Sequence, residues 1–417
     1  MQLTIYSIVF FIFILCQEVK AQVEKTLGSN NPESESQDQT EIQFGTYEKP
    51  DWKVIDINFL NSYYAQDGTH GAVTGGIGTE QLTDFTQKIT LSIPTSPKLS
   101  FNMDAGYDYY SSASTDNIDN IRSSDSASDM RVHGNIGMSY KSSPQHTFGF
   151  RIGGSGEYDY TSINGGLTYD WLSKDQNTAI GIGAQAFLDQ WEIIYPRELR
   201  GQGSLVPTDK RQSYNGMISL SQVVTKKLQI GIQLEATYMK GLLSTPFHRV
   251  YFQEQDQAKV EQLPESRMKI PIGVRANAHL TDWLISRMYY RYYWDDWGVK
   301  SHTVSVELPI KINRFISVYP SYRYHTQTAS EHFRAYKEHT LDQSFYSSDY
   351  DLSRLNSHAI GVGLSISPAA GIAKMKVPFI KRTSIIINSI DLKYSHYMRS
   401  TDLTANIVSL GVNVSIR

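Results

Sequence analysis

The chain has 417 residues, one cysteine and a formal net charge of −3 at pH 7. This charge argues against a nucleic-acid partner, because proteins that bind nucleic acid present a basic surface. Only 40% of the residues are hydrophobic and the mean hydropathy is −0.36, which is too polar for a bundle of membrane-spanning helices.

Residues 1–21 are predicted to be a secretory signal peptide. Ile5–Cys16 is almost wholly apolar, and Val19–Ala21 provides a small-residue pattern for cleavage before Gln22. The apolar run is too short to span a membrane comfortably, which favours cleavage over an uncleaved anchor. Because the cysteine lies in this segment, we expect no disulfide and no thiol chemistry in the mature chain.

Residues 22–50 are polar and acidic, and they contain no aromatic residue before Phe44. This composition, without periodicity, predicts a disordered leader. Residues 51–417 are predicted to form a single domain, because no further change of composition and no solenoid repeat follows.

This domain alternates between apolar and polar residues. In Ser100–Tyr110, residues Phe101, Met103 and Ala105 are apolar, and small or polar residues separate them. Because successive side chains of a strand point to opposite faces, such a segment has one apolar and one polar face. About sixteen segments (14–18) follow this pattern. They are 52–64, 81–93, 98–110, 129–141, 146–160, 162–172, 177–191, 213–224, 228–240, 267–280, 283–294, 298–311, 314–326, 356–367, 384–397 and 403–417.

The connections between these segments alternate in length. Short ones follow the even-numbered segments, whereas most odd-numbered segments precede long ones: 65–80, 111–128, 192–212, 241–266 and 327–355. Short periplasmic turns and long extracellular loops are typical of outer-membrane barrels. The sequence therefore predicts an all-β fold, a transmembrane antiparallel β-barrel in the cell outer membrane whose apolar face contacts lipid.

Residue parity predicts which side chains face the lumen. Two adjacent walls of opposite charge are expected. The acidic wall comprises Asp104, Asp108, Glu157, Asp159, Asp170, Asp189 and Glu235, and the basic wall comprises Lys269, Arg275, Arg287, Arg291, Lys311 and Arg323. Such walls either create a transverse field across an open passage or pair as salt bridges and occlude it. The sequence does not separate these alternatives.

One turn-side connection, 367–383, is unexpectedly long and basic. It carries Lys374, Lys376, Lys381 and Arg382 on the predicted periplasmic side. We expect a surface helix or an arm that docks a periplasmic partner.

Motifs for catalysis or cofactor binding are weak. No phosphate loop, metalloprotease motif, paired-cysteine motif or nucleophile elbow is present. His133, near Asp104 and Asp108, is the candidate for a barrel hydrolase, although a pore-lining role is favoured. Two loops could hold a metal but lack ligand spacing, so no metal and no cofactor are expected. Their candidate ligands are Asp116, Asp119, Asp125 and Asp129, and His332, His339, Asp342, Asp349 and Asp351.

Several stretches together resemble an uncharacterised, domain-of-unknown-function family of exported barrel proteins from Gram-negative bacteria. They are Ser62–Gly68, Ala72–Glu80, Asp108–Asp119, Gly153–Tyr160 and Ile194–Gly201. Members are often encoded beside an FAD:protein FMN transferase and a thioredoxin-like protein. The resemblance implies, by association, a place in an envelope redox system with periplasmic redox or thioredoxin-like partners.

These patterns lead to one main functional prediction and two alternatives. The main prediction is a porin-like channel or the membrane scaffold of an envelope complex. The first alternative is an occluded structural or binding barrel that serves a flavin-linked redox system. The second, less favoured, is an outer-membrane hydrolase.

Overall fold

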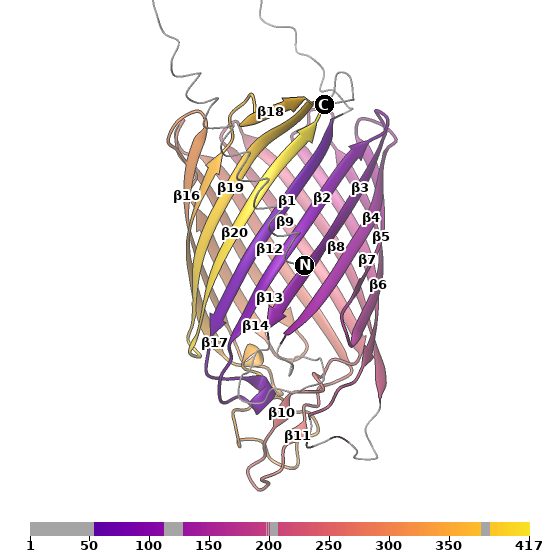
Figure 1. The fold of residues 1–417 in the computed structure, drawn as a ribbon, viewed down its shortest axis with the longest axis vertical. Coiled ribbons are helices and arrows are strands. Elements are labelled where there is room, and N and C mark those ends of the chain that lie inside the picture. Colours follow the sequence, from indigo (N-terminus) through magenta and orange to yellow (C-terminus); the bar gives the residue numbers. More distant parts are fainter. Residues whose placement is uncertain (1–53, 112–127, 197, 199, 201–206, 377–383) are drawn as a thin grey trace, which may run out of the picture.

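In a computed structural model, the protein is a closed antiparallel β-barrel (Figure 1). The structure describes residues 54–111, 128–196, 198, 200, 207–376 and 384–417. Among them, 16 long strands and the short strands β15 (Ile310–Lys311) and β18 (Ala373–Lys376) form one 18-stranded sheet. The long strands are β1 (Ile55–Asp67), β2 (Leu82–Pro94), β3 (Leu99–Ser111), β4 (Ser128–Lys141), β5 (His146–Gly156), β6 (Tyr160–Leu172), β7 (Thr178–Glu192), β8 (Thr208–Thr225), β9 (Leu228–Gly241), β12 (Ser266–His279), β13 (Ile285–Asp295), β14 (Lys300–Glu307), β16 (Ile316–Gln327), β17 (Leu355–Ile366), β19 (Ser384–Arg399) and β20 (Leu403–Ile416).

The first and last strands close the barrel. β1 pairs with β2 on one side and with β20 on the other, in register from Ile55↔Ile416 to Asp67↔Thr404. Closure pairs the backbone groups that an open sheet would leave at its edges, which is the requirement for a sheet surrounded by lipid. The predicted fold is confirmed. The predicted signal peptide (1–21) and the predicted leader (22–50) lie outside the described residues.

Two predicted strand boundaries are wrong. The segment 146–160 ends as a strand at Gly156, because Glu157 N–H donates to Tyr160 O and turns the chain. The segment 298–311 is divided into β14 and β15 at Pro309, which has no N–H to donate to the sheet. The other segments match strands to within three residues at each end, except that β8 begins at Thr208, five residues before the predicted segment 213–224.

The outer face of the barrel is an apolar belt. On β4, Val132 and Ile136 are 52% and 54% exposed, whereas Asp129 on the same strand is 6% exposed. A soluble protein would bury these apolar side chains, so their exposure around a closed sheet fits contact with lipid. Separately, no helix in the described part of the chain is long and apolar enough to cross a membrane.

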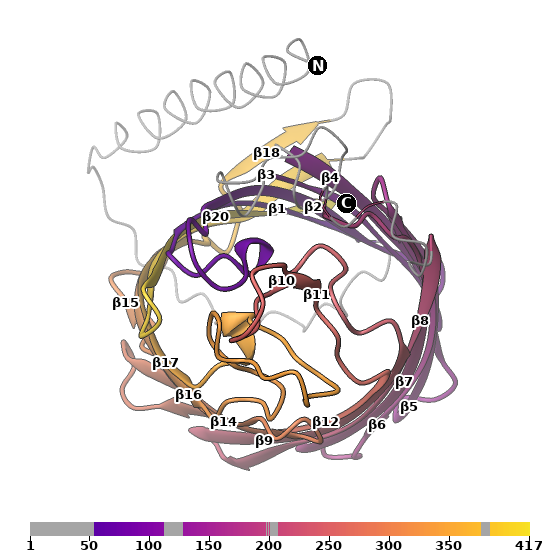
Figure 2. The same cartoon turned by 90° about the horizontal axis from the view of Figure 1, so that it is seen from below.

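Long loops gather at one end of the barrel. We call residues 68–81, 242–265 and 328–354 the loop cap. It includes the hairpin of β10 (Arg249–Val250) and β11 (Lys259–Val260) and the 3-10 helices η1 (Ala72–Thr74) and η3 (Tyr350–Leu352). Viewed from this end, the hairpin and the neighbouring loops lie inside the outline of the barrel (Figure 2). The cap therefore covers the mouth at the long-loop end.

The loop cap has its own apolar core. Val250, Phe252 and Tyr346 pack together at 0%, 1% and 8% exposure. Isolated bridges join Phe252 to His339 and Gln262 to Tyr346. Among the described residues, the largest fully buried side chains, Phe252, His339 and Val250, lie in this cap and not in the barrel. The loops are thus a folded layer, which the sequence analysis did not predict.

Candidate functional site in the barrel lumen

The carboxylates of the predicted acidic wall lie beside cations from neighbouring strands. Asp104 on β3 has Lys88 Nζ at 3.5 Å and Arg151 Nη1 at 3.9 Å, and it accepts a hydrogen bond of 2.9 Å from Asn135 Nδ2. On β7, Asp189 accepts a hydrogen bond of 2.8 Å from Arg211 Nε. This part of the lumen therefore carries both signs of charge.

Two further carboxylates of this wall have basic neighbours. Asp108 Oδ2 lies 3.8 Å from His133 Nδ1, and Glu157 Oε1 lies 3.7 Å from Arg131 Nε. Tyr110 also donates a hydrogen bond of 2.7 Å to Glu157. Sequence reasoning missed Lys88 and Arg211 as partners, because they lie outside the segments from which the wall was read.

The remaining predicted wall carboxylates are Asp159, Asp170 and Glu235. Asp159 lies in the turn between β5 and β6. There, one carboxylate oxygen from each of Asp129, Glu157 and Asp159 lies within 4.8 Å of the other two. Burial raises the pKa of Asp159 to about 6. Asp170 is on β6, and Glu235 on β9 has Gln233 as its hydrogen-bond donor.

The basic wall contributes three arginines to one cavity of about 740 Å³. Arg275, Arg287 and Arg323 line it, together with Lys393 and a single acid, Glu307. Glu307 accepts a hydrogen bond of 2.8 Å from Arg287 Nη1 and lies 3.5 Å from Lys393 Nζ. Other lining residues include Tyr289, Ser305, Ser321, Ser395 and Tyr397.

The other predicted basic residues lie away from this cavity. Arg291 places its guanidinium 5.7 Å from the ring centre of Tyr293. Lys269 is on β12 towards the loop cap, where Asp295 is its cross-strand partner on β13. Lys311 is at the end of β15, on the side of the short turns.

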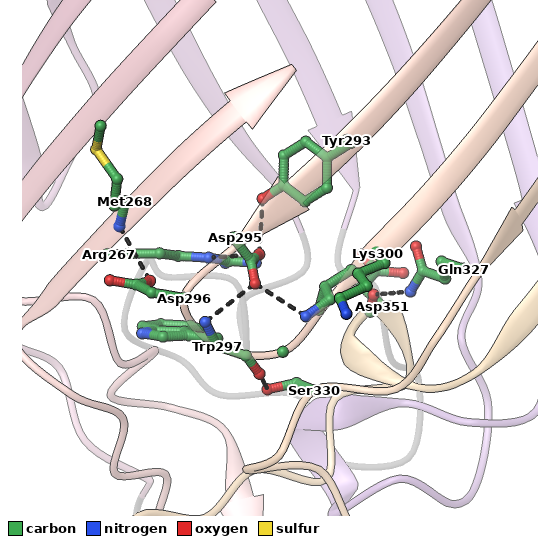
Figure 3. Close-up of polar contacts among 12 residues, drawn as sticks. Arg267, Met268, Tyr293, Asp295, Asp296, Trp297, Lys300, Gln327, Ser330 and Asp351 are labelled. Carbon is green, nitrogen blue, oxygen red and sulfur yellow. Dashed lines mark hydrogen bonds and ion pairs between the residues drawn. The ribbon is translucent and has the colours of Figure 1, made fainter. Parts of the chain in front are cut away.

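A buried carboxylate holds the turn between β13 and β14, which lies next to the loop cap. Asp295, at the end of β13, is 1% exposed and forms an ion pair with Arg267. It also accepts hydrogen bonds of 3.0 Å from the backbone N–H groups of Trp297 and Val299 and one of 2.7 Å from Tyr293 Oη (Figure 3). One side chain thus fixes the turn between β13 and β14.

The same turn contacts two other parts of the chain. The Arg267 guanidinium lies 4.2 Å from the Trp297 ring, whose indole N–H donates to Ser266 O at 3.0 Å. Ser330 Oγ, in the loop cap, donates to Trp297 O at 3.1 Å (Figure 3). A sequence signal for this junction is Asp-Asp-Trp-Gly at residues 295–298, which the sequence analysis did not single out.

Arg399 provides a second junction. Its Nη2 lies 3.6 Å from Glu80 Oε2, and its Nη1 forms an ion pair with Asp351. Glu80 belongs to the first cap loop and Asp351 to the third, so one cation at the end of β19 links both. Burial raises the pKa of Glu80 to about 7, although Arg399 lowers it.

A third junction connects the cap loops to each other. Arg249, at the start of β10, donates a hydrogen bond of 2.6 Å to Val73 O in η1 and forms an ion pair with Glu198. Nearby, Thr245 N–H donates to Glu261, which lies 3.5 Å from His248 Nδ1. The loop cap is thus joined by buried polar contacts as well as by its apolar core.

The model for a family described as protein of unknown function (DUF3570) matches residues 12–377. The chain belongs to this family. The resemblance predicted from the sequence is therefore confirmed. None of the curated proteins matches the chain.

The fold is similar to that of several solved outer-membrane proteins. A bacterial polysaccharide outer membrane secretin is 10% identical and has a TM-score of 0.45, over 88% of this chain and 99% of that one. The siderophore receptor PirA from Pseudomonas aeruginosa is 12% identical, with a TM-score of 0.40 over 88% and 81%. Pseudomonas aeruginosa OccK1 (OpdK) is 8% identical, with a TM-score of 0.39 over 87% and 98%.

Two of the stretches that carry the DUF3570 resemblance lie at the long-loop end of the barrel. Ala72–Glu80 contains η1 and lies in the first loop of the cap, and Gly153–Tyr160 contains the turn with Asp159. Asp116, Asp119 and Asp125 lie outside the described residues. Of that predicted acidic loop, the structure describes Asp129.

The predicted metal candidates of the 327–355 loop do not form a single cluster in the described residues. His339 Nε2 lies 3.0 Å from Ser347 O and its Nδ1 lies 2.8 Å from Gln343 Oε1. His332 packs against Trp297 instead, and Asp342 is exposed. The carboxylate of Asp349 accepts a hydrogen bond from Asp351 N–H, and Asp351 forms an ion pair with Arg399. Both aspartates therefore stabilise the conformation of this loop.

The hydrolase candidate His133 packs over Gly106, its cross-strand partner, and contacts Asp108. Among the described residues, no hydrogen bond joins it to a hydroxyl group.

The long basic connection contains a strand where a surface helix was one of two predictions. β18 pairs with the first residues of β19, from Lys376↔Ser384 to Ala373↔Ile387, and carries Lys374 and Lys376 as exposed side chains. These residues form a strand and not a helix, because β19 begins at Ser384 whereas β17 pairs with β19 only from Ile390 onwards. β18 pairs with the backbone groups of residues 384–387, which β17 does not reach. Lys381 and Arg382 lie outside the described residues.

Proposed function

We propose that this protein resides in the outer membrane, exported through a cleaved signal peptide, and forms a passage for small hydrophilic solutes. The observation that carries the proposal is the polar, cavity-bearing inner face of a closed barrel whose outer face is apolar. Cavities of about 740 Å³ and 540 Å³ are lined by charged, hydroxyl and amide side chains. Such walls stabilise water and polar solutes in the lumen.

Glycines on the inner face support the same proposal. Gly137, Gly166 and Gly183 line a further cavity of about 540 Å³ on the β4–β9 wall. Because glycine has no side chain, these positions leave room in the lumen that larger residues would fill.

The loop cap gives the passage a regulated entrance in this proposal. Its core of Val250, Phe252 and Tyr346 joins the second and third cap loops, and Arg399 joins the first and the third. Ser330 of the third loop also donates to Trp297 O in the β13–β14 turn of the barrel. Loops on the outer side of such barrels commonly control access and selectivity. Solute passage then requires that the cap opens.

Solute uptake into vesicles tests the proposal. Proteoliposomes with the purified protein should take up a small neutral sugar faster than protein-free vesicles, and the native protein should fractionate with the outer membrane. A folded protein whose vesicles are no more permeable than empty ones, even with an opened cap, would rule out a passage.

A second candidate is favoured by the cap itself. A barrel whose mouth stays covered would serve as a membrane scaffold, and Lys374 and Lys376 on β18 would then contact an acidic periplasmic partner, such as a flavin-linked redox protein. This alternative would be favoured by a pull-down from periplasm that depends on these two lysines, combined with proteoliposomes that take up no more solute than empty vesicles. Neither candidate involves a catalytic step.

A further inference from the structure

The cavity of the basic wall has an excess of positive charge. Four cations, Arg275, Arg287, Arg323 and Lys393, line it, whereas Glu307 is its one acidic lining residue. Glu307 already contacts two of the four, Arg287 at 2.8 Å and Lys393 at 3.5 Å. Its charge is therefore shared by these two neighbours.

The other two cations have no such partner. Within the described residues, neither Arg275 nor Arg323 forms an ion pair with a carboxylate, and both side chains are exposed to the lumen. Arg275 instead places its guanidinium 5.7 Å from the ring centre of Tyr289. Two arginines are thus available to a solute that enters the cavity.

The strand register places these arginines in one row across the wall. Arg275 is the cross-strand partner of Tyr289, Tyr289 of Ser305, and Ser305 of Arg323. The two arginines are therefore three strand spacings apart, about 14 Å at Cα, and two hydroxyl-bearing residues, Tyr289 and Ser305, occupy the register positions between them. On the concave inner face of a barrel, long side chains from such positions converge.

Tyr289 is held in this row by a glycine. A Cβ at Gly273 would lie 2.9 Å from the Tyr289 hydroxyl oxygen, so the ring packs over this glycine on β12. The Tyr289 hydroxyl therefore lies over β12, two residues from Arg275 on the same strand. The row thus offers a hydroxyl donor beside the Arg275 guanidinium.

From this row we propose that the cavity is a binding site for a small dicarboxylate. Each guanidinium would bind one carboxylate through two parallel N–H···O hydrogen bonds, and Tyr289 and Ser305 would donate to the oxygens that face them. A monocarboxylate fills half of the row. The claim that dicarboxylates pass through the lumen rests on the proposed passage. The claim that they bind in this cavity does not.

Binding to the purified, folded protein in detergent tests the site independently of conduction. Equilibrium dialysis with radiolabelled adipate should show saturable binding, with hexanoate and inorganic phosphate at least about tenfold weaker. Arg275→Gln and Arg323→Gln should each weaken adipate binding by about tenfold or more, because each removes a charge-assisted pair. Arg151→Gln, which removes one lumen charge outside this cavity, should change it less than about threefold.

Three results of these binding measurements would overturn the inference. No saturable adipate binding, equal binding of phosphate or hexanoate, or an equal loss in Arg151→Gln would show that the row does not recognise a dicarboxylate. Vesicle uptake measured on the same preparations separates the two claims. Binding without uptake would contradict the passage and leave the site, whereas uptake without binding would contradict the site alone.

Discussion

Arg399 and Glu80 form a buried ion pair at the junction between barrel and cap, with 3.6 Å between Nη2 and Oε2. The two atoms are buried without a hydrogen-bond partner among the described residues. Asp351 and Asp349 add negative charge around Glu80, and the backbone of His70 donates to it. This environment makes the junction sensitive to the protonation of Glu80.

The first prediction concerns pH. Burial raises the pKa of Glu80 from 4.5 to about 7 in the folded protein, so the folded state binds a proton that the unfolded loop releases. The stability of the closed cap should therefore be greatest at acidic pH and should fall as pH rises from about 4.5 to about 7. Hydrogen exchange of residues 68–81 should be slower at pH 5 than at pH 8, after correction for the intrinsic rate.

Glu80→Gln provides the control for this prediction. The amide keeps the shape of the side chain without a titrating group, so most of the pH dependence should disappear. Burial also raises the pKa of Asp349, which leaves a smaller dependence of the same sign. Protection that increases with pH in the native protein would contradict the assignment.

The second prediction concerns the cap core. Phe252→Ala should cost about 3–5 kcal/mol of cap stability, because it leaves a cavity beside Val250 and Tyr346. The cap loops should become sensitive to protease while the barrel keeps its heat-dependent mobility on gels. Phe345→Ala, in the same cap but 38% exposed, is the matched control and should leave protease resistance nearly unchanged.

The third prediction concerns Asp295. Asp295→Ala leaves the Arg267 guanidinium without its buried partner and two backbone N–H groups without an acceptor, so the β13–β14 turn should lose about 3–5 kcal/mol of local stability. Limited proteolysis near Trp297 measures this. Asp296→Ala removes an exposed acceptor that contacts Met268 N–H and should have a small effect; equal effects of the two variants would contradict the role of Asp295.

The fourth prediction concerns a glycine inside the barrel. Gly363 pairs across strands with Tyr319, and a Cβ there would lie 2.0 Å from the tyrosine ring. Gly363→Ala should therefore destabilise the barrel by about 1–3 kcal/mol, because the ring must move. At Gly216 a Cβ would meet nothing within 4 Å, so urea unfolding of Gly216→Ala in lipid vesicles should resemble the native curve.

The barrel could be predicted from sequence because its signal is local. The alternation in Ser100–Tyr110 depends only on the two-residue period of a strand, and β3 occupies Leu99–Ser111. The loop cap could not be predicted, because its core joins Phe252 and Tyr346 from different loops, and no local period marks such contacts. Lys88 and Arg211 were missed as partners of Asp104 and Asp189, because they lie outside the segments from which the acidic wall was read.

Single-channel recording in planar bilayers tests the capped passage most directly. The native protein should show discrete but infrequent openings, and Phe252→Ala, with its barrel intact, should open more often at the same voltage. Silent bilayers for both proteins, after correct insertion has been verified, would contradict a solute passage through this barrel.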